Sequence, residues 1–238
     1  MITPSEVLKA TFLVWSRNAT ALVVLSFLTY TPSLIHTWLA TEDPIATFGT
    51  EEGLLMFTAI ATLLGAVATF FNQAIATWAG LQTLNAQPTS TSDVLRRGFA
   101  SMGKVFTTAL LAGLCVGLGL VAFVIPGIII AMMFSAAVPV RLAEGTGAVA
   151  ALKRSAQLTQ GSRGAIFAAL FALNIASIVV QKVLEPTSVD GIRVSMMATV
   201  VFAAMWGSLT SCLNVVVYHL LRTRKEGLDA ASLAKVFD

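Results

Sequence analysis

The feature that most constrains the fold is a run of 36 residues without a charge, which lies between Lys104 and Arg141. A straight helix of that length would extend for about 54 Å at roughly 1.5 Å per residue. The hydrocarbon core of a bilayer is only about 30 Å thick and needs about 20 apolar residues to cross it. The run is therefore predicted to fold back as a hairpin of two spans. Its bend is expected at Pro126-Gly127, because proline disrupts a helical turn and glycine accepts left-handed backbone angles.

The rest of the chain has the composition of a helical membrane protein. Of its 238 residues, 56% are hydrophobic and 11% are charged, and the mean hydropathy is +0.83. A soluble domain usually carries about 25% charged residues. We predict an all-α fold, a bundle of six transmembrane helices that forms a single membrane domain over residues 1–238. The expected spans cover about residues 19–39, 54–78, 105–124, 127–143, 165–183 and 195–220.

The polar segments between the spans have the pattern of amphipathic surface helices. In the first, Thr3 is the expected N-cap and Glu6 completes a capping box. Leu8, Phe12 and Trp15 recur at helical spacing and predict its apolar face. Two similar helices are expected on the same side of the membrane, at residues 93–104 and 144–164.

The distribution of lysine and arginine predicts the orientation of the bundle. Thirteen of the 15 basic residues fall on one side in this topology, and only Lys182 and Arg193 fall on the other. The positive-inside rule therefore places both termini in the cytoplasm. The basic excess then indicates topology and contact with anionic lipids of the cytoplasmic leaflet, and it does not indicate nucleic-acid binding.

Three segments suggest an internal repeat. SEVLKATF at residues 5–12 and SDVLRRGF at residues 92–99 share a serine, an acid, Val-Leu, a base and a phenylalanine at equal spacing. The segment ALKRSAQLTQGSR at residues 151–163 follows the pattern more loosely. Two explanations stay open: duplication of a unit made of a surface helix and a hairpin, or the common pattern of amphipathic helices beside a membrane.

Several short motifs carry a resemblance to a known family. They are Ile125-Pro126-Gly127, Pro139, Glu144-Gly145, residues 151–155 and 158–161, and a terminal set of Tyr218, Leu221-Arg222, residues 224–227 and Asp229. In these motifs the chain resembles the bacterial YciC-like proteins and the related membrane domain found beside some glycerophosphoryl diester phosphodiesterases. The resemblance implies a six-helix protein of the bacterial inner membrane. It does not imply the phosphodiesterase activity, which belongs to a separate catalytic domain. Arg141 and His219 depart from the family pattern.

The sequence shows no constellation of catalytic, cofactor-binding or metal-binding residues. His36 and His219 are expected near opposite faces of the membrane, so they do not share a metal ion. Cys115 and Cys212 lie midway along apolar runs and are predicted to be small buried residues. No charged residue falls in the middle of a predicted span. We therefore expect neither an enzyme nor a cofactor.

Two polar groups are the candidate functional residues. Glu144, Lys153 and Arg154 lie at the cytoplasmic end of the hairpin, and with the basic pair Arg96-Arg97 they are candidates for holding a lipid phosphate. The alternative is structural, with Glu144 capping a helix or pairing with Arg154. The second group lies within spans, where a polar solute or a neighbouring helix are the two candidate partners. Its members are Asn72, Asn174 and Asn214.

The sequence favours a non-catalytic envelope protein that binds lipid or partner proteins, including further copies of itself, through its cytoplasmic helices. A transporter or channel for a small or amphiphilic solute is the alternative, because transporters often contain internal repeats. An enzyme embedded in the membrane would require polar groups that converge at one leaflet.

Overall fold

A computed structural model describes residues 2–40, 50–85, 91–185 and 192–227, and within these ranges every regular element is a helix. This confirms the all-α prediction. The elements in chain order are α1 (Pro4–Arg17), α2 (Ala19–Ala40), α4 (Glu51–Leu84), α5 (Thr91–Ala122), α6 (Val124–Phe134), α7 (Ala137–Glu144), α8 (Ala148–Thr159), α9 (Arg163–Leu184) and α10 (Ile192–Glu226).

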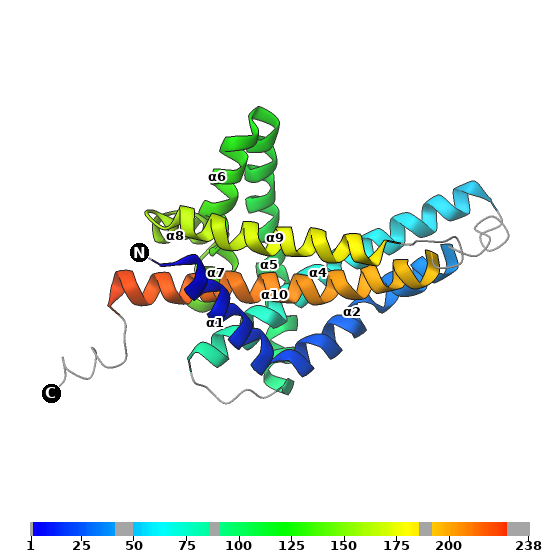
Figure 1. Ribbon diagram of the computed structural model, residues 1–238, viewed down its shortest axis with the longest axis horizontal. Helices are drawn as coiled ribbons and strands as arrows, with labels where there is room; N and C mark the ends of the chain where they lie inside the picture. The colour runs from blue at the N-terminus through cyan, green and yellow to red at the C-terminus, as the bar shows by residue number, and fades with distance from the viewer. Residues whose placement is uncertain (1, 41–49, 86–90, 186–191, 228–238) are drawn as a thin grey trace.

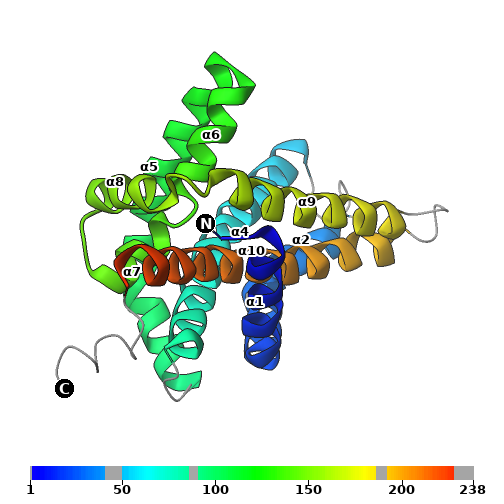
Figure 2. The ribbon, with the colours of Figure 1, turned by 60° about the vertical axis from the view of Figure 1, so that its left-hand side comes forward.

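The helices form a bundle with a projecting hairpin. α2, α4, α9 and α10 lie alongside one another, and α1 packs against α10 (Figure 1). The hairpin of α5 and α6 stands across the direction of these four helices, as both ribbon views show (Figures 1 and 2). The short helices α7 and α8 lie where the base of the hairpin meets the end of α10 (Figure 2).

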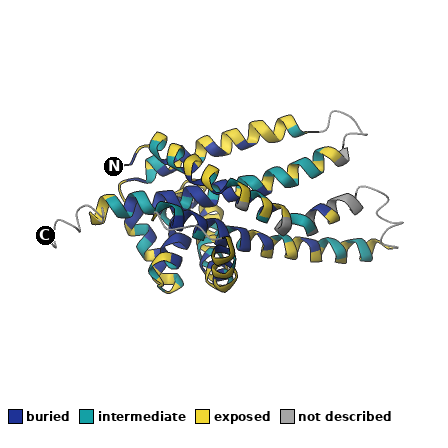
Figure 3. Cartoon of the chain, turned by 90° about the horizontal axis from the view of Figure 1, so that it is seen from below, coloured by how far each residue is buried: buried dark blue, intermediate teal, exposed yellow. Residues whose placement is uncertain are grey.

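Burial is concentrated at one end of the bundle (Figure 3). Ile75 of α4 and the stretch from Cys212 to Val217 of α10 lie there, and Ile75 is only 1% exposed. In the first half of α4, Leu55 and Leu63 are 70% and 66% exposed. A water-soluble surface rarely carries apolar patches of such extent, so these outward faces indicate contact with lipid.

The hairpin turns earlier than the sequence predicted. α5 ends at Ala122, Phe123 is extended with φ −162° and ψ 144°, and α6 begins at Val124. Pro126 lies in the first turn of α6, where a backbone N–H has no intrahelical acceptor, so proline costs little there. Gly127 lets the two helices approach, because a Cβ at this position would lie 2.7 Å from the backbone nitrogen of Leu120.

One predicted boundary within this region was wrong. Residues 93–104 are not a separate surface helix, because they continue without a break into the span and form the 32-residue helix α5. The chain offers no proline there, and isolated glycines are tolerated inside a helix. The span predicted at residues 127–143 falls within Val124–Glu144, a helical stretch long and apolar enough to cross a membrane, which has a turn at Ser135 and Ala136 between α6 and α7.

The first surface helix forms as predicted but buries a different face. Thr3 Oγ1 accepts from the Glu6 backbone N–H at 3.4 Å, so the N-cap is present. The buried side chains are Val7, Thr11 and Val14, and Phe12 of the predicted stripe is 49% exposed. The two stripes are one position apart, and packing against α10 selects between them.

Five helical stretches in the part of the chain that the structure describes are long and apolar enough to cross a membrane. They are Glu51–Leu84, Thr91–Ala122, Val124–Glu144, Arg163–Leu184 and Val194–Glu226.

Candidate functional site

The candidate site is built from the end of α7. Gly145 follows the helix with φ 66°, a left-handed conformation that glycine adopts without strain, and its N–H bonds to the Arg141 carbonyl at 3.1 Å. The helix therefore stops immediately after Glu144. A carboxylate at a helix C-terminus faces the negative end of the helix dipole, so it requires positive partners.

Arg154 on α8 supplies the first positive partner. Its Nε lies 3.4 Å from Glu144 Oε2, and its Nη2 pairs with Glu226 Oε1 at the end of α10. The Glu144 side chain is 18% exposed and that of Arg154 is 33% exposed. One guanidinium therefore bridges carboxylates from two helices that are distant in the sequence.

The last turns of α10 close this set of contacts into a ring. Glu226 Oε2 accepts from Arg222 Nε at 3.2 Å, and Arg222 Nη1 donates to the Tyr218 hydroxyl at 3.0 Å. The Tyr218 hydroxyl in turn donates to Glu144 Oε1 at 3.2 Å. We call these five side chains, Glu144, Arg154, Glu226, Arg222 and Tyr218, the polar ring. It contains two carboxylates and two guanidiniums and is formally neutral.

Two further contacts fix the same end of α10. Arg224 Nη2 lies 2.6 Å from both carboxylate oxygens of Glu6 on α1. Lys225 Nζ donates to the carbonyls of Gln157 and Gln160, at 3.0 and 2.7 Å. Those carbonyls lie at the end of α8, where the Gln157 carbonyl also accepts from the Gln160 backbone N–H at 3.4 Å. The end of α10 therefore holds α1, α7 and α8 together.

The structure separates the basic residues that the sequence grouped. Arg154 pairs with Glu144, whereas its neighbour Lys153 is exposed and forms no ion pair with another described residue. The Arg96 side chain is 81% exposed, and its Nη2 lies 3.7 Å from Asp93 Oδ1. Arg97 lies over the ring of Trp78, with 5.2 Å from its guanidinium carbon to the ring centroid.

The three asparagines of the spans do not form one polar centre. Asn72 of α4 is buried, and its Nδ2 donates to Ser26 Oγ of α2 at 2.7 Å, a bond between helices. Asn174 is exposed on α9 and donates to the Leu170 carbonyl of its own helix. Asn214 lies half-buried on α10. None of the cavities described below is lined by any of the three.

The charges of the polar ring are paired by its own members. Each carboxylate faces a guanidinium, and the tyrosine hydroxyl both donates and accepts. Within the ranges described above, no three His, Cys, Asp or Glu side chains are grouped so as to hold a metal ion. Cys212 is buried as predicted, whereas Cys115 is exposed on α5. A cavity of about 250 Å³ adjoins the ring and is lined in part by Tyr218 and His219.

Sequence reasoning found two members of the ring and missed three. Glu144 and Arg154 were paired as one alternative, but Tyr218, Arg222 and Glu226 were noted only as parts of a family motif. Their spacing carries a usable signal, because residues four apart lie on one face of a helix. No sequence rule indicated which other helix that face meets.

Together the fold and this site define a helical membrane protein with several spans, held at one end by polar contacts. No family model, no curated protein and no solved structure matches the chain.

Proposed function

We propose that this chain is a multi-pass protein of the bacterial inner membrane, with cytoplasmic termini, that binds anionic lipid headgroups through bases at its cytoplasmic end. In addition to the five helical stretches named above, α2 is a span in this proposal. It is a 22-residue helix that corresponds to the predicted span at residues 19–39. The YciC-like motifs support the same assignment. The protein is non-catalytic in this proposal, and its polar ring holds the cytoplasmic helix ends in place.

The observation that carries the proposal is that the bases fall into two sets. Arg154 and Arg222 are half-buried and contact carboxylates of the polar ring. A second set is exposed and forms no ion pair elsewhere in the described chain. Bases near an anionic membrane surface each contribute about 1 kcal/mol to binding. The members of this exposed set are Lys9, Arg17, Lys104 and Lys153.

The pattern of burial is the same in three segments, and it fits both a duplicated unit and three ordinary amphipathic helices. In each segment, four buried residues are spaced four, three and four residues apart. The carboxyl end of each segment leads into an outgoing helix, which is α2, the remainder of α5, or α9. The matching buried sets are Val7, Thr11, Val14 and Asn18; Val94, Gly98, Ser101 and Val105; and Ala151, Ser155, Leu158 and Ser162.

Lipid preference tests the proposed function. Phosphatidylglycerol should raise the melting temperature of the purified protein in detergent more than phosphatidylcholine does. Charge reversal at both Lys104 and Lys153 should reduce this difference, because both belong to the exposed set and lie outside the polar ring. Lys182→Glu, the same kind of change at the predicted outer side, is the control and should leave the difference intact. An unchanged preference in the double variant would overturn the proposal.

Cysteine labelling tests the topology. In a chain whose two native cysteines are replaced by serine, Thr50→Cys and Gln157→Cys provide exposed labelling sites near opposite ends of the proposed spans. A membrane-impermeant maleimide should label Thr50→Cys in intact spheroplasts and Gln157→Cys only after permeabilisation. Labelling of both in intact spheroplasts would contradict the proposed orientation.

A further inference from the structure

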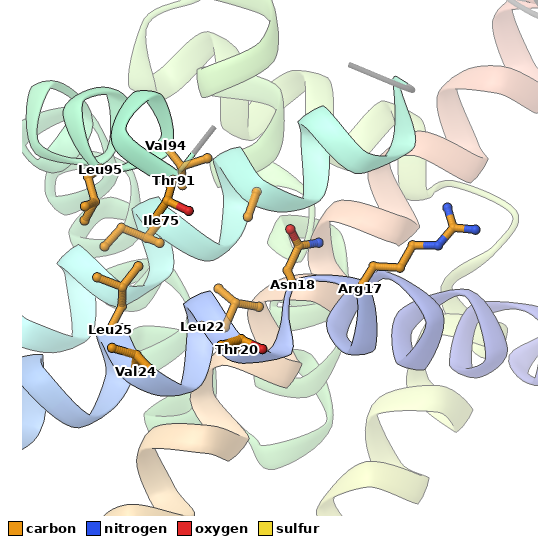
Figure 4. Close-up of a pocket in the computed structure, with 11 residues that line it drawn as sticks. Arg17, Asn18, Thr20, Leu22, Val24, Leu25, Ile75, Thr91, Val94 and Leu95 are labelled. Carbon is orange, nitrogen blue, oxygen red and sulfur yellow. The ribbon is translucent and has the colours of Figure 1, made fainter. Parts of the chain in front are cut away.

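A cavity of about 560 Å³ lies between the start of α2, the second half of α4 and the start of α5. Its volume falls within the 300–1,000 Å³ that is typical of ligand pockets. Figure 4 shows side chains from these three helices around it. It is separate from the polar ring and shares no lining residue with the ring.

The walls change from polar to apolar along α2. Arg17 lies at one end of the cavity and Leu25 lies toward the other, where Ile75 and the Thr91 hydroxyl also face it (Figure 4). Arg17 is the last residue of α1, and Leu25 lies in the second turn of α2, beyond the non-helical Asn18. A ligand that lies along α2 therefore meets a cation at one end and mostly hydrocarbon at the other.

The floor of the cavity is closed and its rim is open. Leu22 and Ile75 are each 1% exposed and Ala79 is 3% exposed, so the floor is apolar and solvent-free. Val24 on the rim is 52% exposed, and Thr20 is exposed as well. In a spanning α2, this rim faces the surrounding lipid.

The polar atoms of the cavity do not suit a fully polar solute. The Asn18 amide nitrogen already donates to the Val14 carbonyl at 2.8 Å and to Thr83 Oγ1 at 2.7 Å. A polar solute would leave its own donors unpaired against the apolar floor, which is costly. An alkyl chain has no such groups.

From this arrangement we infer that the cavity binds one acyl chain of an anionic phospholipid from the cytoplasmic leaflet, with the phosphate at Arg17. The inference rests on the proposed function for the side of the membrane on which Arg17 lies. Arg17 is exposed and forms no ion pair with a described residue, so its guanidinium is available to a phosphate. Arginine matches phosphate geometry with two parallel hydrogen bonds.

Native mass spectrometry tests this site directly. The full chain in detergent is titrated with phosphatidylglycerol and phosphatidylcholine of matched acyl chains. We expect one phosphatidylglycerol molecule to be retained after the remaining lipid is stripped. Arg17→Gln should weaken its binding about fivefold, the loss of one base near a membrane surface, and should remove the preference between the two lipids.

Two substitutions that occupy the cavity should abolish the retained lipid. Val24→Trp fills it from the exposed rim and Ala79→Leu fills it from the floor. Val121→Trp is the matched control, because Val121 is 88% exposed on the hairpin and lies outside the cavity. Each variant's melting temperature reports whether it folds, and Val24→Trp, at a half-exposed position, should melt within a degree or two of the parent.

The outcomes separate this inference from the proposed function. Retention of the lipid by folded Val24→Trp and Ala79→Leu, or equal retention of the two lipids by the parent, would overturn the acyl-chain site. Loss of the lipid from Val121→Trp as well would overturn it too. Charge reversal at Lys104 and Lys153 reduces the general preference for anionic lipid under the proposed function, but it should spare the single retained molecule.

Discussion

The contact between Arg154 and its two carboxylates offers the sharpest test of the structure. Arg154→Gln removes the cation that lies between Glu144 and Glu226 and keeps a polar side chain of similar reach. The preceding residue, Lys153, provides a matched control, because it lies on the same helix, is exposed, and has no ion pair in the described part of the chain. Lys153→Gln removes the same charge from the same helix.

The magnitude follows from the geometry. At 3.4 Å, the separation of Arg154 Nε and Glu144 Oε2, two unit charges attract by about 5 kcal/mol at an effective dielectric constant of 20, and by about 1.2 kcal/mol in bulk water. The Arg154 side chain is 33% exposed, so screening and the entropy of ordering it reduce the gain. We therefore expect Arg154→Gln to lower the free energy of unfolding by about 2 kcal/mol.

The assay is thermal unfolding in detergent, followed by tryptophan fluorescence. For a chain of this size, about 2 kcal/mol corresponds to a fall in melting temperature of roughly 4–8 °C. Lys153→Gln should shift it by less than about 2 °C, which corresponds to the usual limit of about 0.5 kcal/mol for surface substitutions. Equal shifts for the two variants would refute the assignment of Arg154 to the polar ring.

A double-mutant cycle isolates the pair. Glu144→Gln and Arg154→Gln are measured alone and together, and contacting residues typically show coupling of about 0.5–3 kcal/mol. Strict additivity would mean that Glu144 and Arg154 do not interact in the folded protein, even if each variant is destabilised.

Three other substitutions probe different parts of the fold. Gly127→Ala should destabilise the hairpin by about 1–3 kcal/mol through overpacking, because its Cβ would lie 2.4 Å from the Leu120 side chain. Gly113→Ala, whose Cβ would have no atom within 4 Å, should be neutral or stabilising. Thermal unfolding distinguishes the two variants, and similar losses of stability would argue against the close approach of α5 and α6. Lys225→Met should speed amide hydrogen exchange in the last turn of α8 but not in its first turn, and unchanged protection would show that the lysine does not cap α8. Asn72→Leu should lower stability by about 0.6–1.7 kcal/mol through loss of the bond to Ser26, and a rise in melting temperature would contradict that contact.

Much of the architecture follows from local properties of the sequence. The long runs of apolar residues predict membrane helices because each backbone polar group must find its partner within the helix once it is in lipid. Residues 54–78, 165–183 and 195–220 each lie within one helix of the structure. The Thr3 cap and the stop at Gly145 follow from residue type alone, because they depend on contacts within one turn.

Tertiary structure decides those features for which the local sequence allows two conformations or two buried faces about equally well. On α1, the stripes that contain Val7 and Leu8 are both apolar, and only packing against α10 selects the first for burial. The hairpin turn falls at Phe123 because Gly127 must pack against Leu120, a contact between different helices. Neither choice is visible in a pattern of single residues.

The candidate site shows the same division. The sequence by itself predicted that thirteen of the 15 basic residues fall on one side of the membrane, because this count depends only on where the charges lie between the apolar runs. Only the folded chain decided that Arg154 is turned inward and that Lys153 is left exposed. The physical reason is that a long side chain acquires its partner from a helix distant in sequence. For Arg154 that helix is α10, whose end brings Glu226 beside it.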